Sequence, residues 1–462
     1  MKYQRGQALA LGLVFMTLVL MVVLFSFNAS QLNLNSNKLQ HTADNAAYSM
    51  AVLAARDLNY KAYTNRAMVA NQISVAQTVG LSSYLEMHTV FLQNASAALG
   101  WLPGVGQVIA SMSQVMSGVN QVAQPLLEHV LLPAESIALE ALSGSQQLLH
   151  MAGLVQSFSL PASVITDNDV DARLDFAQNA MFINKFQEHW LVMQDTFDRT
   201  QPEQQYSEHV NVIMSSRDQF SSARNQRWPV PFSLPADLPV LRVNTHQRGG
   251  SDLFLNNNQE ESWTSMDTVS THVERLGLSC SWRRGCRLRW RRTEVPVGWG
   301  GTVSDNRAQL RHINSNSMWG GSRSRNPRAS HLAASSQKSM SGTPGYNGIR
   351  KFYDFSDRQQ IGINETANIT VVVSKPTQHI RTSRQSEWGN DRIDPAINEQ
   401  FFGNRMTTIA SANVHYSRPR DLWPRGGNQH EFGNMYNPYW QPKLNETTNQ
   451  ARIQIRGLTG AL

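Results

Sequence analysis

An uncharged apolar run near the N-terminus constrains this chain more than any other feature. Residues Ala8 to Phe27 read ALALGLVFMTLVLMVVLFSF, without a charged side chain. At about 1.5 Å rise per residue, a helix of this length spans about 30 Å, the thickness of a bilayer's hydrocarbon core. The run is longer than the apolar region of a cleaved signal peptide, and no A-x-A site follows it. We therefore predict a retained transmembrane anchor over residues 8–27.

The charges that flank this run predict its orientation. Lys2 and Arg5 precede the run, whereas Lys38 is the first basic residue after it. The positive-inside rule then keeps residues 1–7 in the cytoplasm and exports the chain beyond residue 28. In a bacterium, this is a single-pass inner-membrane protein with a C-terminal domain in the periplasm.

Composition narrows the classes of protein that this chain can represent. The 462 residues carry a net charge of +7, but only 16% are charged, against about 25% in ordinary soluble domains. Charge alone would allow nucleic-acid binding, which the exported location excludes. Two cysteines are too few for a disulfide-dense scaffold or a four-thiolate zinc site.

A helix is predicted to continue out of the membrane as a stalk over residues 28–79. Leu39, Ala43, Ala46, Met50 and Leu53 recur at spacings of three and four, as in a coiled coil. We name these residues the alanine seam. It either packs within the chain or pairs with a helix of a partner. Gly80 is the expected hinge at the end of the stalk.

Residues 80–200 are predicted to be helical. Glycine and proline breakers favour hairpins of short helices, each too short and too polar for a second membrane span. The expected helices cover about 81–99, 105–122, 126–142 and 145–157, and an amphipathic helix covers 171–200.

The remainder of the chain favours strands and loops, which makes the fold class α+β. Residues 201–313 form a mixed region rich in proline and arginine, and 314–348 read as a flexible loop. Residues 349–462 form a β-containing C-terminal region, mixed α/β or β-rich. Its clearest strand is 368–374, with further candidates at 351–355 and 408–416.

Motifs for catalysis or cofactor binding are not found in the sequence. There is no HExxH, no G-x-S-x-G, no phosphate-binding glycine loop and no Cys/His zinc spacing. We therefore predict a protein that is not an enzyme and has no catalytic residues, no cofactor, no metal and no small-molecule substrate.

Residues 275–292, RLGLSCSWRRGCRLRWRR, form the most unusual local segment. Cys280 and Cys286 could close a short hairpin with a disulfide, since the compartment is oxidising. Arginine interleaved with tryptophan suits an acidic partner surface or an anionic polymer, and a solvated hairpin without a ligand is the alternative. The candidate partner patch consists of Arg275, Arg283, Arg284, Arg287, Arg289, Arg291, Arg292, Trp282 and Trp290.

Two N-terminal motifs carry a resemblance to a known family. Arg5-Gly6-Gln7 opens the apolar helix, and the helix continues with Leu39-Gln40-x-x-Ala43-Asp44-x-Ala46-Ala47. This pattern resembles TadE/TadG-like proteins of the Flp (Tad) pilus-assembly system. Asn437-Pro438-Tyr439-Trp440 is similar to the end of the longer TadG-like members.

The resemblance implies a membrane component of Flp pilus assembly that acts as a minor subunit, an anchor or an organiser, with pilin-like or other Tad proteins as partners. Pilin-like relatives are cut after a glycine and carry a glutamate five residues later. Leu11 stands at that place here, so we expect no cleavage after Gly6. The alternative function is an anchored binding module or adhesin that recognises an anionic surface polymer through the Arg/Trp patch.

Overall fold

The protein is mixed α and β, with a long N-terminal helix and a β-rich C-terminal region. The computed structural model describes residues 5–174, 182, 187, 190–200, 204–228, 233, 240–255, 261–282, 285–312, 320–356, 365–380, 405–418, 432–449 and 451–453. The chain divides into two compact units, and each is discontinuous in sequence. The first unit comprises Met1–Tyr63, Gln146–Asp195 and Tyr353–Leu462; the second comprises Thr64–Ser145 and Thr196–Phe352.

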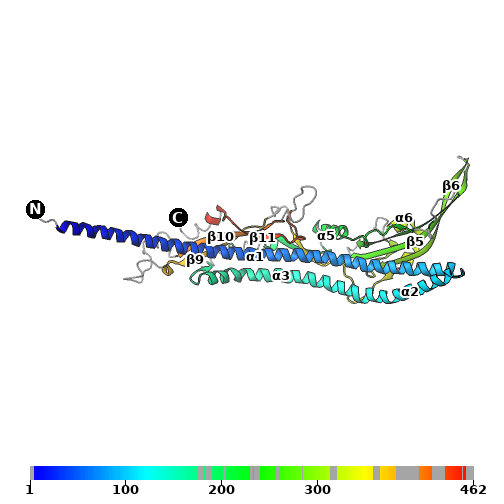
Figure 1. Ribbon diagram of the computed structural model, residues 1–462, viewed down its shortest axis with the longest axis horizontal. Coiled ribbons are helices and arrows are strands. Elements are labelled where there is room, and N and C mark those ends of the chain that lie inside the picture. Colours follow the sequence, from blue (N-terminus) through cyan, green and yellow to red (C-terminus); the bar gives the residue numbers. More distant parts are fainter. Residues whose placement is uncertain are drawn as a thin grey trace. The chain divides into compact units, whose positions relative to one another are not determined.

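Helix α1 (Arg5–Leu99) is one unbroken helix of 95 residues (Figure 1). The predicted hinge at Gly80 is therefore wrong. A Cβ at Gly80 would lie 2.7 Å from the Ser251 hydroxyl and 3.1 Å from the Arg224 guanidinium. Glycine serves here to let a neighbouring segment approach the helix closely, which the sequence pattern alone cannot distinguish from a hinge.

Two further helices follow α1. Helix α2 spans Val105–Leu126, a π-helical turn η1 spans Leu127–Leu131, and α3 spans Leu132–Asn168. The predicted break at Gly144 is absent, so the expected helices at 126–142 and 145–157 are parts of one helix. Pro125 and Pro133 flank the π-helical turn. Since proline cannot donate the usual helical hydrogen bond, the wider turn replaces the predicted break.

The first unit contains a four-stranded antiparallel sheet in the order β1-β9-β10-β11. Its strands are β1 (Arg173–Leu174), β9 (Ile369–Pro376), β10 (Arg405–Tyr416) and β11 (Trp440–Asn445). Alternate apolar residues of β9 and β10 join the buried side of α1 in one core. This confirms the strands predicted near 368–374 and 408–416.

The second unit contains a five-stranded sheet in the order β3-β4-β5-β6-β7. The strands are β3 (Gln226–Arg227), β4 (Leu241–Leu255), β5 (Glu261–Ser281), β6 (Gly285–Val303) and β7 (Lys338–Ser339). Strands β5 and β6 form a hairpin far longer than the short one predicted (Figure 1). At Gly300 a Cβ would lie 2.1 Å from the Ser83 carbonyl oxygen, so glycine allows β6 to lie against α1.

The segment 314–348 was expected to be a loop, but most of its described part is structured. It contains α6 (Gly320–Arg325), α7 (Pro327–Ser335) and β7. Helix α7 buries Ala329 and Ala333, and its alanines pack against Met266 and Val303 of the sheet. These few alanines are hard to recognise as core residues in the sequence, because the segment around them is rich in serine and arginine.

The helix predicted over 171–200 is also wrong at both ends. Strand β1 occupies residues 173–174, and β2 (Gln194–Phe197) pairs with β8 (Phe352–Phe355) in a two-stranded sheet. Most residues between these strands lie outside the described part of the chain. Helix α5 (Gln204–Ser215) and the short 3-10 turns η2 (Leu310–His312) and η3 (Thr377–His379) complete the elements.

Candidate functional site

The helical motif of α1 lies in the core of the first unit. Leu39, Ala43, Ala46 and Ala47 are fully buried, and Met50 is nearly so. They pack against alternate residues of two strands, which are Ile369, Val371 and Val373 on β9 and Ala410, Ala412 and Val414 on β10. Alanine side chains allow the helix and the sheet to approach closely. The alanine seam therefore packs within the chain.

The polar residues of the same motif connect the helix to strand β10. The Gln40 side chain donates from Nε2 to the Ile409 carbonyl (3.3 Å) and accepts from the Thr408 hydroxyl. It also donates to Asp44 Oδ1, one turn along α1 (2.9 Å). Gln40 and Asp44 thus form a polar clamp beside the alanine seam.

The C-terminal motif meets the same helix. Trp440 is 2% exposed and begins β11. Its backbone N–H donates to Asn59 Oδ1 (3.0 Å), and Asn59 Nδ2 donates to the Trp440 carbonyl (2.8 Å). Asn437 lies in a tight turn whose backbone N–H groups bind the Asn434 side chain. The start and end of the chain are therefore joined in one core.

Comparison with protein families finds a match to the first part of helix α1, which includes the alanine seam and Gln40 and Asp44. Residues 6–57 match the Flp pilus-assembly TadE/G-like (Tad) family. The N-terminal segment is a TadE/G-like domain. The resemblance stated from the two N-terminal motifs is thereby confirmed for this segment. A search of curated proteins and a search of solved structures each find no match to the chain.

The TadE/G-like domain begins with a helix whose apolar residues face outward. Helix α1 begins at Arg5, while the side chains of Arg5, Gly6 and Gln7 lie outside the described residues. From Ala8 to Phe27 all the side chains are exposed. Two stretches, Ala8–Leu99 and Val105–Asn168, are long and apolar enough to cross a membrane by length and composition. The second corrects the expectation that no further segment qualifies.

A buried charged cluster lies just beyond the alanine seam, in the first unit. Lys61 Nζ lies 2.7 Å from Asp57 Oδ2, 2.7 Å from His150 Nδ1 and 2.6 Å from Gln194 Oε1. It also lies 4.0 Å from the centre of the Tyr353 ring. Lys61 is fully buried. Sequence reasoning missed this site, although an i,i+4 acid–base pair on the apolar side of a helix is a usable signal.

Burial and charge act in opposite directions on the pKa values of this pair. Burial lowers the pKa of Lys61 to about 8, although Asp57 partly opposes the shift. Burial alone would raise the pKa of Asp57, but the hydrogen bond with His150 and the charge of Lys61 outweigh it and lower that pKa. The arrangement joins α1 to α3 and to β2, and its chemistry is that of a structural ion pair.

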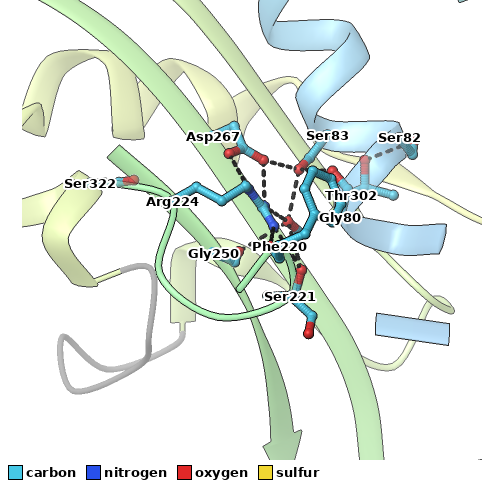
Figure 2. Close-up of polar contacts among 12 residues, drawn as sticks. Gly80, Ser82, Ser83, Phe220, Ser221, Arg224, Gly250, Asp267, Thr302 and Ser322 are labelled. Carbon is cyan, nitrogen blue, oxygen red and sulfur yellow. Dashed lines mark hydrogen bonds and ion pairs between the residues drawn. The ribbon is translucent and has the colours of Figure 1, made fainter. Parts of the chain in front are cut away.

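The second unit contains a comparable cluster on the sheet (Figure 2). The Arg224 guanidinium donates from Nε to Asp267 Oδ1 (2.8 Å) and from Nη2 to Asp267 Oδ2 (2.7 Å). The Ser83 hydroxyl of α1 donates to the same carboxylate, and Ser265 accepts from Arg224 Nη2 (2.8 Å). All four side chains are buried. This bidentate pair and the Ser83 hydroxyl connect α1, β5 and the segment before β3.

The predicted partner patch lies at the end of the β5–β6 hairpin. Arg275 is on β5, and Arg287, Arg289, Arg291 and Arg292 are on β6. Arg283 and Arg284 lie outside the described residues, and Trp282 beside them is fully exposed. Cys280 is the register partner of Cys286, and no free cysteine occurs in the described part of the chain.

Strand alternation divides this patch into two faces. Arg275 pairs with Arg291 and Gly277 with Arg289, so these arginines share one face. The other face carries Leu276 with Trp290 and Leu278 with Leu288. A guanidinium, that of Arg242, lies 4.1 Å from the centre of the Trp290 ring. The sequence predicted one mixed patch, whereas the hairpin places Arg275, Arg289 and Arg291 on the face opposite Trp290.

Arg292 does not belong to the exposed basic face. Its guanidinium contacts both ring nitrogens of His272 (2.9 and 3.1 Å) and donates to the Arg325 carbonyl.

In the described ranges, no group of three or more His, Cys, Asp or Glu side chains could hold a metal ion.

Proposed function

We propose that this chain is a membrane-anchored, non-enzymatic component of a Flp/Tad pilus-assembly system. The match of residues 6–57 to the TadE/G-like family carries the proposal. The matched part of α1 contains the apolar stretch and most of the helix residues in the core of the first unit. The family supports a structural role with other pilus components as partners.

The proposed anchor is the exposed apolar stretch of α1. Every large apolar side chain from Leu9 to Phe25 is at least 42% exposed. Contact of these side chains with water is unfavourable. A bilayer would cover them, with Lys2 and Arg5 on the cytoplasmic side and both units in the periplasm. Extraction of an uncut helix would move two charges across hydrocarbon, which favours a fixed post in the inner membrane.

The fold favours one of the two candidate surfaces for binding a partner. The alanine seam is buried in the first unit's core, so a pilin-like helix cannot pair with it without opening that core. The basic face of the β5–β6 hairpin remains exposed and suits an acidic surface on an assembly partner. We therefore assign partner binding to this face.

Deletion and complementation test the assembly role. Loss of the gene should abolish surface pili while pilin remains in the cell, and the wild-type chain should restore them. A Leu18→Arg variant should fail to restore them and should leave the membrane fraction, whereas Leu18→Ile should behave as wild type. Intact pili with lost adhesion in the deletion strain would instead support an anchored adhesin.

The partner face is tested by charge removal at matched positions. Combining Arg275→Gln, Arg289→Gln and Arg291→Gln should weaken recovery of pilus components after crosslinking in intact cells. The control combines Arg56→Gln, Arg66→Gln and Arg311→Gln, which remove the same charge from other exposed positions. Equal recovery with both variants would contradict the assignment.

A further inference from the structure

Helix α2 carries a continuous stripe of exposed apolar side chains in the second unit. Each is between 47% and 73% exposed. The stripe consists of Val105, Val108, Met112, Val115, Val119, Val122 and Leu126. Burying large apolar side chains stabilises a protein by about 1.5–3 kcal/mol each, so an exposed row of them indicates a missing partner.

The spacing of the stripe is that of a coiled coil. Its residues alternate between steps of three and four along the whole helix, so they occupy the a and d positions of consecutive heptads. This regularity identifies the missing partner as another helix, because a strictly alternating seam matches the surface of a second helix.

The other side of α2 already has its partner within the chain. Asn120, which is buried, donates to Glu86 Oε2 of α1 (3.0 Å). Gln124 donates to the Ser82 carbonyl (3.1 Å) and accepts from the Ser82 hydroxyl (2.7 Å). Helix α2 therefore lies against α1 on one side (Figure 1), while the side chains of the apolar stripe are exposed.

A glycine beside the stripe supports close approach of a second helix. A Cβ at Gly118 would meet no atom within 4 Å, so nothing in the described chain requires glycine there. Glycine in a helix interior costs about 1 kcal/mol relative to alanine. Gly118 and Ser111 occupy equivalent positions one heptad apart, each directly before an a position, and both are small.

The composition of α2 argues against a lipid surface as the partner. Helices that lie on membranes usually carry lysine or arginine on their polar face, and α2 has no charged residue at all. Although the stretch Val105–Asn168 qualifies as a span by length and composition, Gln107, Gln114 and Gln121 recur once per heptad in α2, which favours a helix as its partner over hydrocarbon.

We propose that the apolar stripe binds the same stripe of α2 in a second copy of this chain, with the two helices parallel. An uncharged helix offers no ion pair to a charged partner and has no like charges that would repel its own copy. Copies anchored in one membrane share an orientation, which favours the parallel pair and raises their effective concentration. Only this last step rests on the proposed anchoring.

Single cysteines test the interface directly. In a Cys280→Ser, Cys286→Ser background, Val115→Cys places a thiol on the stripe and Gln114→Cys places one at the neighbouring glutamine position. Mild oxidation of membranes containing the full chain should give about tenfold or more crosslinked dimer for Val115→Cys than for Gln114→Cys. Equal yields would overturn the proposal, and so would protection of Val115→Cys by lipid without crosslinking.

Charge insertion provides a second test. Val115→Glu with Val122→Glu should convert the purified full chain from dimer to monomer in sedimentation, whereas Gln114→Glu with Gln121→Glu should leave the dimer intact. A wild-type monomer in both membrane crosslinking and sedimentation would refute self-association. Membrane fractionation of the same variants reports on anchoring, so failure of the anchor and failure of the dimer can be distinguished.

Discussion

Asn59 of α1 completes the backbone hydrogen bonding of Trp440, a residue 381 positions further along the chain. The amide side chain accepts from the backbone N–H and donates to the backbone carbonyl of one residue at the beginning of β11. Helix α1 and the C-terminal segment are thereby parts of one folded unit.

Removing this amide should destabilise the first unit. Asn59→Ala leaves the N–H and the carbonyl of Trp440 without their partner, at an expected cost of about 1–3 kcal/mol in the free energy of unfolding. Urea unfolding of the detergent-solubilised full chain measures the loss. Asn37→Ala is the control, because Asn37 is exposed on the same helix and its replacement gains the same helix propensity. Equal stability of the two variants would contradict this role.

Close packing of the alanine seam should make it intolerant of larger side chains. Ala43→Leu inserts three carbons between α1 and the sheet, so we expect a loss of about 1–3 kcal/mol in the free energy of unfolding. His41→Leu on the exposed side of the same helix should change stability by less than about 0.5 kcal/mol. If Ala43→Leu were tolerated equally well, the helix would not be packed on the sheet as described.

The Asp57–Lys61 pair should show strong coupling in a double-mutant cycle. Lys61→Met leaves a buried carboxylate unpaired and should cost about 3–5 kcal/mol. Asp57→Leu should cost less, because the pKa of Lys61 is already lowered to about 8 by burial and the amine can become neutral. The double variant should recover most of the stability. A double variant as unstable as Lys61→Met would exclude the ion pair.

His209 should make the second unit sensitive to acid. Its ring is fully buried and stacks on Phe352 with centroids 4.0 Å apart, and burial lowers its pKa to about 3. Between about pH 6.5 and 3 the unfolded chain binds a proton that the folded chain does not. Stability should therefore fall as the pH falls, by up to about 1.4 kcal/mol per pH unit from this group.

The test for His209 compares slopes of stability against pH between pH 6 and 4. His209→Phe should flatten the slope, whereas His41→Phe at an exposed position should leave it unchanged. An identical slope for wild type and His209→Phe would show that His209 does not contribute.

The register of Cys280 and Cys286 predicts a disulfide that stabilises the end of the hairpin. Replacing both with serine should weaken the closed end by about 2–3 kcal/mol in the chain-entropy model. The rate of trypsin cleavage at the arginine-rich end should rise, while overall unfolding stays unchanged because the base of the hairpin packs in the second unit. Rapid alkylation of both thiols in the oxidised protein would disprove the bond.

Local sequence patterns predicted the elements whose determinants are local. The apolar run at Ala8–Phe27 and the spacing of Leu39, Ala43 and Ala46 were sufficient to predict a long helix and a family resemblance. Alternating valines and isoleucine predicted β9. Each of these patterns involves only residues within a few helical turns or one strand, so it can be recognised in the amino-acid sequence alone.

Tertiary structure decided everything that depends on close approach between distant segments. Gly80 was expected to be a hinge but accommodates Ser251, and the serine-rich segment near 320–335 forms helices because alanines find an apolar sheet to cover. The partners of Lys61 include Gln194, which is 133 residues away, and Tyr353, which lies still further along the chain. Spacing along the chain cannot reveal such contacts, because burial and pairing are set by which segments meet in space.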